Sequence, residues 1–341
     1  MDILKQFFGR RADGRWEIQS LKPVPLNPKD GAGGDFYEVR NGLFAADPSF
    51  VGTIISIMGQ SIVPVVAHVP GENVLRCLGT GFFISCSGLL ITAAHVILDP
   101  IDRKYADVRE IGDQNLHFGE LKLGVLIPVS PLSGMKGYIF RDIEWATFLA
   151  NYADNPLPIR GIDLRLTSDT ALCKVVPIAE DVPYQPLAII QPGIKGIGMA
   201  VGKKMTAVGY GSMQDVELSP AAENAFSGDC SFNLHVSRGR VLDHYPDNAI
   251  AKHVPTPGAC FSASARLPAG MSGSPIFDDE RIYVHGVVSK GWENEDGSEL
   301  GFGSMLAYSL ALPLKALGGR TLLELLKSSE HGITKISIPD A

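Results

Sequence analysis

Long apolar runs are absent from the 341-residue sequence, and no stretch approaches the ~18 consecutive apolar residues that a membrane-spanning helix needs. Residues 1–20 also lack the apolar segment and small-residue cleavage site of a secretory signal. Basic charge is not in excess, because 37 Asp and Glu outnumber 30 Lys and Arg and give a net charge of -7. We therefore expect either a cytoplasmic protein or a chain that lacks its leader, and in both cases one that binds neither membranes nor nucleic acids.

Cysteine is scarce as well. The five cysteines form an odd set with no CxxC pair and no spacing to histidines that is typical of a metal site. The sequence therefore predicts no disulfide scaffold, no metal centre and no cofactor. The cysteines are Cys77, Cys86, Cys173, Cys230 and Cys260.

Helical periodicity is rare, and short apolar runs separated by turn residues dominate instead. Hydrophobic residues make up 45% of the chain, and 37 Gly and 23 Pro supply many turns. Runs such as 61–69, 79–85 and 203–211 are rich in Val, Ile, Phe and Tyr, which is typical of strands. This pattern favours an all-β sandwich or barrel over alternating strands and helices. One stripe of leucines within 320–332 predicts a C-terminal helix.

Two short segments carry residues suited to catalysis. His95 follows two alanines in TAAH (92–95) at the end of an apolar run, and such small residues allow another segment to approach the imidazole. Ser272 lies between two glycines in GMSGSP (270–275), which permit a tight turn. Such a turn can aim the backbone amides of Gly270 and Ser272 at one point, as an oxyanion hole requires.

A carboxylate is the expected partner of this histidine. Asp169 opens the strand-like run DTAL (169–172), where a carboxylate can orient an imidazole and stabilise its cation. Asp142 is a rival for this role, and Asp163 is a weaker one. The long interval between His95 and Asp169 suggests an insertion around residues 100–165.

Taken in order, TAAH, DTAL, GMSGSP and GVVSKG (286–291) resemble the chymotrypsin/trypsin-like serine peptidases, especially their bacterial-type members. The resemblance covers about residues 60–315. It implies an all-β fold of two six-stranded antiparallel β-barrels with the site between them. The predicted organisation is an N-terminal extension (1–55), a first barrel with His95 and Asp169 (56–190), a second barrel with Ser272 (191–315), and a C-terminal helix and tail (316–341).

The resemblance also implies a function, that of a serine endopeptidase acting on a protein or peptide. Ser272 attacks the peptide carbonyl to give an acyl-enzyme, His95 transfers the proton, and Asp169 holds the imidazole. Ser289 matches the segment that pairs with the substrate backbone, and Gly291 matches a position that lines the primary specificity pocket. The alternative is a catalytically inactive, protease-like binding module.

Two departures from the digestive members of this family bear on regulation and specificity. Met271 precedes Ser272 where those members carry an Asp that pairs with a newly freed N-terminus, so we expect no activation by N-terminal cleavage. Counting six residues back from Ser272 places Arg266 at the floor of the pocket, which predicts a preference for Asp or Glu on the acyl side of the cut. Alternatively, Arg266 points outward or is neutralised by an acid such as Glu280 or Glu293. The sequence leaves open the natural substrate, the oligomeric state, the role of residues 1–55 and any regulatory partner.

Overall fold

The computed structural model describes most of the segments from residue 61 to residue 328, together with three short segments nearer the N-terminus. Asp163, Cys230 and Glu280, which enter the sequence-based predictions, lie outside the described residues. The described residues are 8–10, 16–18, 37–39, 61–69, 71–102, 108–112, 115–118, 121–128, 138–152, 164–177, 183–189, 199–220, 226–227, 232–246, 254–278, 283–293, 299–306, 310, 313–314 and 318–328.

Six antiparallel strands close the first barrel in the order β11-β6-β5-β4-β9-β10, with β10 pairing back to β11. All seven residues of β4 are buried, because one face lines the barrel and the other is covered by the rest of the molecule. The strands are β4 (Ile62–His68), β5 (Val74–Phe83), β6 (Leu89–Thr92), β9 (Lys122–Pro128), β10 (Tyr138–Tyr152) and β11 (Leu164–Val175).

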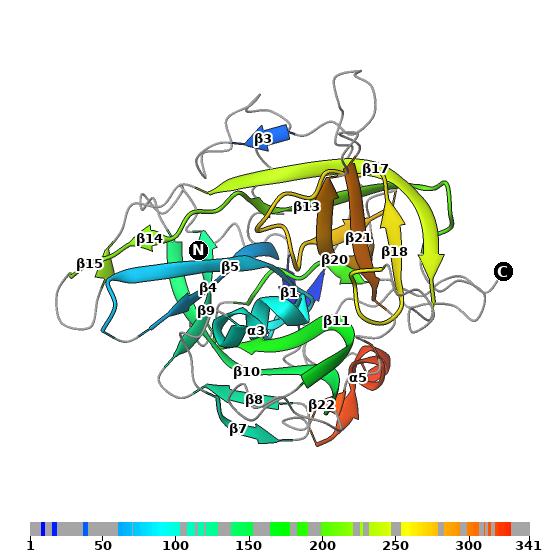
Figure 1. Ribbon diagram of the computed structural model, residues 1–341. Coiled ribbons are helices and arrows are strands. Elements are labelled where there is room, and N and C mark those ends of the chain that lie inside the picture. Colours follow the sequence, from blue (N-terminus) through cyan, green and yellow to red (C-terminus); the bar gives the residue numbers. More distant parts are fainter. Residues whose placement is uncertain are drawn as a thin grey trace.

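Six more antiparallel strands close the second barrel in the order β20-β19-β13-β17-β18-β21, with β21 pairing back to β20. The predicted pair of six-stranded antiparallel barrels is therefore confirmed, and Figure 1 shows the second barrel above the first. The strands are β13 (Lys204–Gly211), β17 (Asn233–Tyr245), β18 (Cys260–Ala263), β19 (Pro275–Phe277), β20 (Tyr283–Glu293) and β21 (Glu299–Met305).

Several short strands lie outside the two barrels. The hairpin of β7 (Val108–Gly112) and β8 (Asn115–Phe118) extends the first sheet beyond β10, while β9 and β10 belong to the barrel itself. The long interval between His95 and Asp169 thus holds two barrel strands as well as the added hairpin. The remaining strands are β1 (Phe8–Arg10), β2 (Trp16–Ile18), β3 (Tyr37–Val39), β12 (Ala188–Ile189), β14 (Val216–Glu217), β15 (Ser219–Pro220), β16 (Phe226–Ser227), β22 (Pro313–Leu314) and β23 (Arg320–Thr321). Among these, β3 pairs with β17 of the second barrel.

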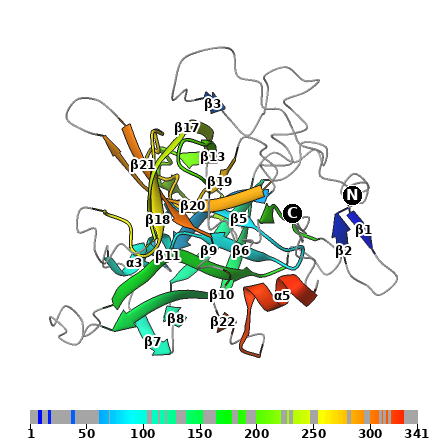
Figure 2. The same ribbon diagram turned by 90° about the vertical axis from the view of Figure 1, so that its right-hand side faces the viewer.

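The predicted C-terminal helix is confirmed as α5 (Leu322–Ser328), which lies beside the first barrel (Figure 2). Its start is a capping box, since the Glu324 carboxylate accepts the Thr321 backbone N–H at 2.6 Å and the Thr321 hydroxyl accepts the Glu324 N–H at 3.3 Å. Leu322 and Leu325 are fully buried in the larger apolar cluster, which the first barrel dominates. Among the described residues, no helix is long and apolar enough to cross a membrane.

Thr80 of β5 ties the first barrel to the second. Its backbone N–H donates to the carbonyl of Ser272 at 2.8 Å. Its hydroxyl donates to the carbonyl of Gly270 at 2.9 Å and accepts the backbone N–H of Tyr210 at 3.0 Å. Because Thr80 is fully buried, these bonds have no competition from water, and they fix the turn at residues 270–275 against the first barrel.

Replacing this hydroxyl tests the tie between the barrels. Thr80→Val keeps the shape of the side chain but leaves the Tyr210 N–H and the Gly270 carbonyl with one bond fewer in a buried site. We expect the free energy of unfolding to fall by about 1–3 kcal/mol, measured by urea denaturation. Thr80→Ser keeps the hydroxyl and serves as the control, and its free energy of unfolding should fall by less. Equal stability of Thr80→Val and the native protein would contradict the role of these bonds.

Candidate active site

The strand register brings Asp169 to His95. Ala171 of β11 pairs with Thr92 of β6, so Asp169, two residues earlier, lies opposite the start of α3 (Ala94–Asp102). Its Oδ1 accepts the backbone N–H of His95 at 3.0 Å, which is one of the amides left without a partner at a helix N-terminus. The imidazole Nδ1 lies 2.8 Å from Oδ2 and 3.0 Å from Oδ1 of the same carboxylate. One carboxylate therefore fixes both the backbone and the ring of His95.

Burial and charge act in opposite directions on this pair. Burial alone would raise the pKa of Asp169, but the adjacent His95 and the hydrogen bonds from His95 and Ser289 hold it below its ordinary value. Burial alone would lower the pKa of His95, but the charge and hydrogen bond of Asp169 raise it above 6.5. Asp99 of α3 acts in the same direction as Asp169, and Lys290 opposes both. The result favours an ionised Asp169 and a more basic His95.

The rival acid does not approach His95. Asp142 lies on β10 with an exposed side chain, and among the described residues it makes no hydrogen bond or ion pair with His95. Asp169, in contrast, is only 1% exposed. The geometry therefore favours Asp169 over Asp142 as the partner of His95.

The turn that carries Ser272 leaves two amides unused. Gly270 and Gly273 adopt φ values of +92° and +89°, a region that favours glycine. The Met271 N–H donates to Pro268 and the Gly273 N–H donates to Val288. Among the described residues, no hydrogen bond uses the backbone N–H of Gly270 or Ser272. These are the two amides that the sequence predicts for an oxyanion hole.

Ser289 contacts both the acid and the predicted nucleophile. It lies at a β-bulge, since the register of β20 with β21 shifts between Val288 and Lys290. A bulge changes the direction in which a side chain points. Here the Ser289 hydroxyl points to Asp169 and donates to its Oδ2 at 2.5 Å. The Ser289 carbonyl accepts the Ser272 hydroxyl at 3.1 Å. Among the described residues, no hydrogen bond joins Ser272 to His95.

A cavity of about 460 Å³ brings the three predicted catalytic side chains together. The His95 side chain is 42% exposed, so the ring is open to a bound molecule. Gly291 lines the cavity, as predicted for a pocket wall, and a Cβ there would lie 2.0 Å from the Leu267 carbonyl. The cavity is lined by His95, Asp169, Pro255, Pro257, Leu267, Pro268, Ala269, Ser272, Val288, Ser289, Lys290 and Gly291.

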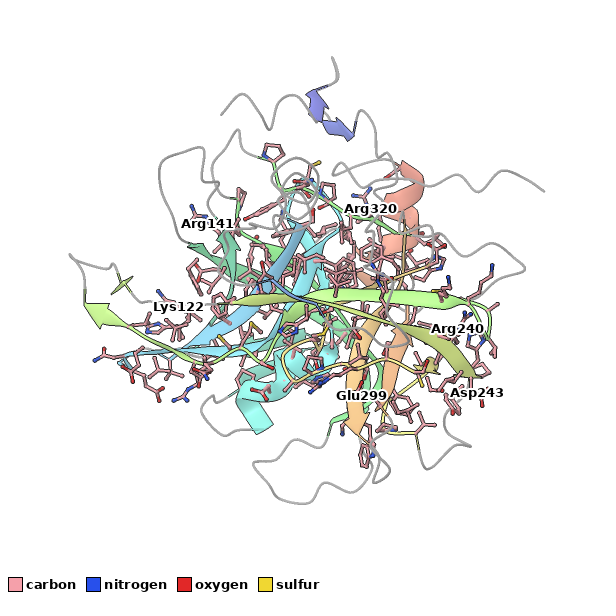
Figure 3. All side chains as sticks on the ribbon, turned by 90° about the horizontal axis from the view of Figure 1, so that it is seen from above. Lys122, Arg141, Arg240, Asp243, Glu299 and Arg320 are labelled. Atoms are coloured by element: carbon pink, nitrogen blue, oxygen red, sulfur yellow. The ribbon has the colours of Figure 1, made fainter. Side chains whose placement is uncertain are left out.

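Arg266 does not line this cavity, contrary to the expectation that it forms the pocket floor. Burial alternates along this segment, since Ala265 and Leu267 are buried while Arg266 between them is exposed. The Arg266 side chain is 56% exposed, and its Nε lies 3.2 Å from a carboxylate oxygen of Glu299. Glu299, which Figure 3 labels, stands at the start of β21. This is the outward, neutralised arrangement that the sequence leaves as the alternative, with Glu299 as a described acidic partner.

The sequence analysis also missed residues that border the cavity. Leu267 and the two prolines of VPTPG (254–258) line it but belong to no recognisable motif. Lys290 also lines it and lies within GVVSKG (286–291), where the sequence analysis assigned roles only to Ser289 and Gly291. Leu267 lies directly after Arg266, so a count that was one residue shorter would have selected Leu267, which lines the cavity. The Pro-Thr-Pro run is the one visible signal, because prolines restrict the backbone.

The chain matches the family described as "Trypsin-like peptidase domain" over residues 79–287, a range that includes His95, Asp169 and Ser272. One similar solved structure, titled "Crystal structure of Deg5", is 14% identical with a TM-score of 0.39. That match covers 75% of this chain and 88% of the other. A search of curated proteins gave no match. Because the family match spans more than half of its length, the chain belongs to the trypsin-like peptidase family.

Proposed function

We propose that the protein is a serine endopeptidase with Ser272 as nucleophile, His95 as general base and Asp169 as the acid that orients it. The observation that carries this proposal is the buried Asp169 carboxylate bound to His95 Nδ1 beside Ser272 in one cavity. This arrangement leaves the other ring nitrogen, Nε2, available to accept a proton. The proposed function class rests on the chemical roles that Ser272, His95 and Asp169 can take in this arrangement, as well as on the family match.

The proposed reaction begins with a rotation of the Ser272 side chain. Its hydroxyl leaves the Ser289 carbonyl and turns toward His95, since a serine side chain has three staggered positions. Ser272 Oγ then bonds to the peptide carbonyl carbon while His95 Nε2 takes the hydroxyl proton. The N–H groups of Gly270 and Ser272 stabilise the negative oxygen that forms.

The second half of the reaction releases both products. His95 returns the proton to the leaving amine as the carbon–nitrogen bond breaks, which leaves an acyl group on Ser272. Water then loses a proton to His95 and attacks the acyl carbon, which frees the acid and restores the Ser272 hydroxyl. Asp169 stays ionised throughout and stabilises the imidazolium.

Packing, rather than an ion pair, holds the turn in its competent shape. Met271 is fully buried in the apolar cluster of the second barrel, together with Val288 and Ile276. A buried methionine needs no charged N-terminus as partner, so the proposed enzyme is competent without N-terminal cleavage. We also expect it to need no oxidation, since the five cysteines form an odd, small set without the spacing of a disulfide scaffold.

The cavity walls favour an apolar side chain on the acyl side of the cut. Leu267, Val288, Pro255 and Pro257 supply apolar surface. Among the described lining residues the one carboxylate is Asp169, which is already engaged by His95 and Ser289. A cationic substrate side chain would therefore lose its hydration without gaining a free carboxylate as partner. The cation that lines the cavity, Lys290, has an exposed side chain.

Removing the nucleophile tests the proposed function directly. Ser272→Ala is expected to lower peptide hydrolysis by about 10⁴-fold or more while leaving the fold intact by circular dichroism. Ser274→Ala, which removes a fully buried hydroxyl two residues away, is the matched control and should keep most activity. Comparable activity of Ser272→Ala and the native protein would refute the assignment.

The assignment of Asp169 as the orienting acid is tested by kcat and by the pH dependence of kcat/KM. A neutral His95 is the active base and its pKa is raised, so kcat/KM should increase with pH with a midpoint above 6.5. Asp169→Asn removes the charge that raises this pKa, so the midpoint should move to lower pH while kcat falls by about 10⁴-fold. Asp142→Asn should change neither quantity. The reverse pattern would assign the acid to Asp142.

A peptide-library cleavage profile tests the proposed specificity. We expect cuts after apolar residues in the native protein and an unchanged profile in Arg266→Ala, because that side chain lies outside the cavity. Leu267→Ala enlarges the cavity and should shift the preference toward larger apolar residues. A preference for Asp or Glu that Arg266→Ala abolishes would contradict this account.

A further inference from the structure

A second buried hydroxyl lies behind Ser289. The Thr256 hydroxyl donates to Ser289 Oγ at 3.1 Å, and Ser289 in turn donates to Asp169. Thr256 and Ser289 are only 1% and 3% exposed. The three side chains therefore form one buried hydrogen-bonded series that ends on the carboxylate bound to His95.

Each hydroxyl in this series has one hydrogen, and this fixes which group donates each hydrogen bond. A serine hydroxyl has a single hydrogen to donate but can accept with its lone pairs. Since Ser289 accepts the hydrogen of Thr256, its own hydrogen is left to donate to Asp169. Without Thr256, the Ser289 hydroxyl is free to rotate toward other acceptors, and the carboxylate can lose a bond that stabilises its ionised form.

The backbone around Thr256 is restrained by sequence. It lies between Pro255 and Pro257 in VPTPG (254–258), and the two prolines fix their own φ angles. A residue before proline is itself confined to extended conformations, and a β-branched side chain has few rotamers. Both prolines line the cavity, while Thr256 is buried behind them. The segment is thus suited to holding one hydroxyl in one direction.

We propose that Thr256 is a positioning residue that acts through Ser289 to hold the Asp169 carboxylate in the geometry in which it orients His95. Ser289 is well placed to pass on this effect, because its carbonyl also accepts the hydroxyl of Ser272. The proposal rests on the proposed serine endopeptidase function. It assigns to the Pro-Thr-Pro segment a role beyond that of a cavity wall.

The test uses Thr256→Val, which keeps the shape but removes the donor, and Thr256→Ser, which keeps the hydroxyl. The first readout is the titration of the His95 imidazole by NMR, assigned with His95→Ala, which requires no catalysis. A weaker bond from Ser289 leaves more negative charge facing His95, so Thr256→Val should shift the His95 titration to higher pH. Asp99 and Lys290 also act on His95 but are unchanged in both variants.

The second readout is kinetic. Thr256→Val should lower kcat by roughly two- to tenfold, the value of about one hydrogen bond, with KM unchanged. Thr256→Ser should restore both the titration and kcat. An unshifted His95 titration in Thr256→Val, or equal losses in the two variants, would overturn the positioning role.

The two readouts separate this proposal from the proposed function. If the native protein hydrolyses no peptide but Thr256→Val still shifts the His95 titration, the endopeptidase assignment fails and the link from Thr256 to the Asp169–His95 pair stands. If the native protein is active and only KM or the melting temperature changes, Thr256 is a structural residue of the cavity wall and the proposal fails.

Discussion

The site depends on the hydrogen bonds by which Thr80 joins the two barrels. His95 and Asp169 belong to the first barrel and Ser272 to the second, so a small shift between barrels separates them. Thr80 bonds through its backbone to Ser272 and through its hydroxyl to Gly270, at the two ends of the predicted oxyanion hole. The Thr80 carbonyl also accepts the Thr92 hydroxyl at 2.7 Å, two residues before the helix that carries His95. This one buried threonine therefore links the predicted nucleophile to the strand that leads to the base.

The charge of Asp169 then sets the basicity of His95. A carboxylate as deeply buried as Asp169 stays ionised only if its oxygens are occupied, and the backbone N–H and ring of His95 and the hydroxyl of Ser289 occupy them. The same carboxylate raises the pKa of His95. The glycines at 270 and 273 contribute a second kind of constraint, since a Cβ on Gly273 would lie 1.9 Å from the Thr80 carbonyl. The turn can meet the first barrel so closely only with glycine at this position.

The strands could be anticipated because short apolar runs between turn residues indicate them. The pair of six-stranded barrels was implied only by the family resemblance, which short contiguous segments around His95, Asp169 and Ser272 carry. The cavity wall could not be anticipated in the same way. Arg266 and Leu267 are adjacent, and only the local backbone conformation decides which of them faces the cavity. The bulge at Ser289 depends on the pairing of β20 with β21, and the bond from Thr256 joins residues 33 positions apart. No local pattern records either of them.

The central claim is that Ser272 is a nucleophile activated by His95 and Asp169, and the most direct measurement is covalent labelling with a fluorophosphonate. The reagent phosphorylates an activated serine, and mass spectrometry locates the adduct without knowledge of the substrate. The account predicts a single adduct on Ser272 in the native protein and a much slower reaction in His95→Ala and Asp169→Asn. A folded native protein that is not labelled would be a protease-like binding module instead, and an adduct on another serine such as Ser274 would place the nucleophile elsewhere.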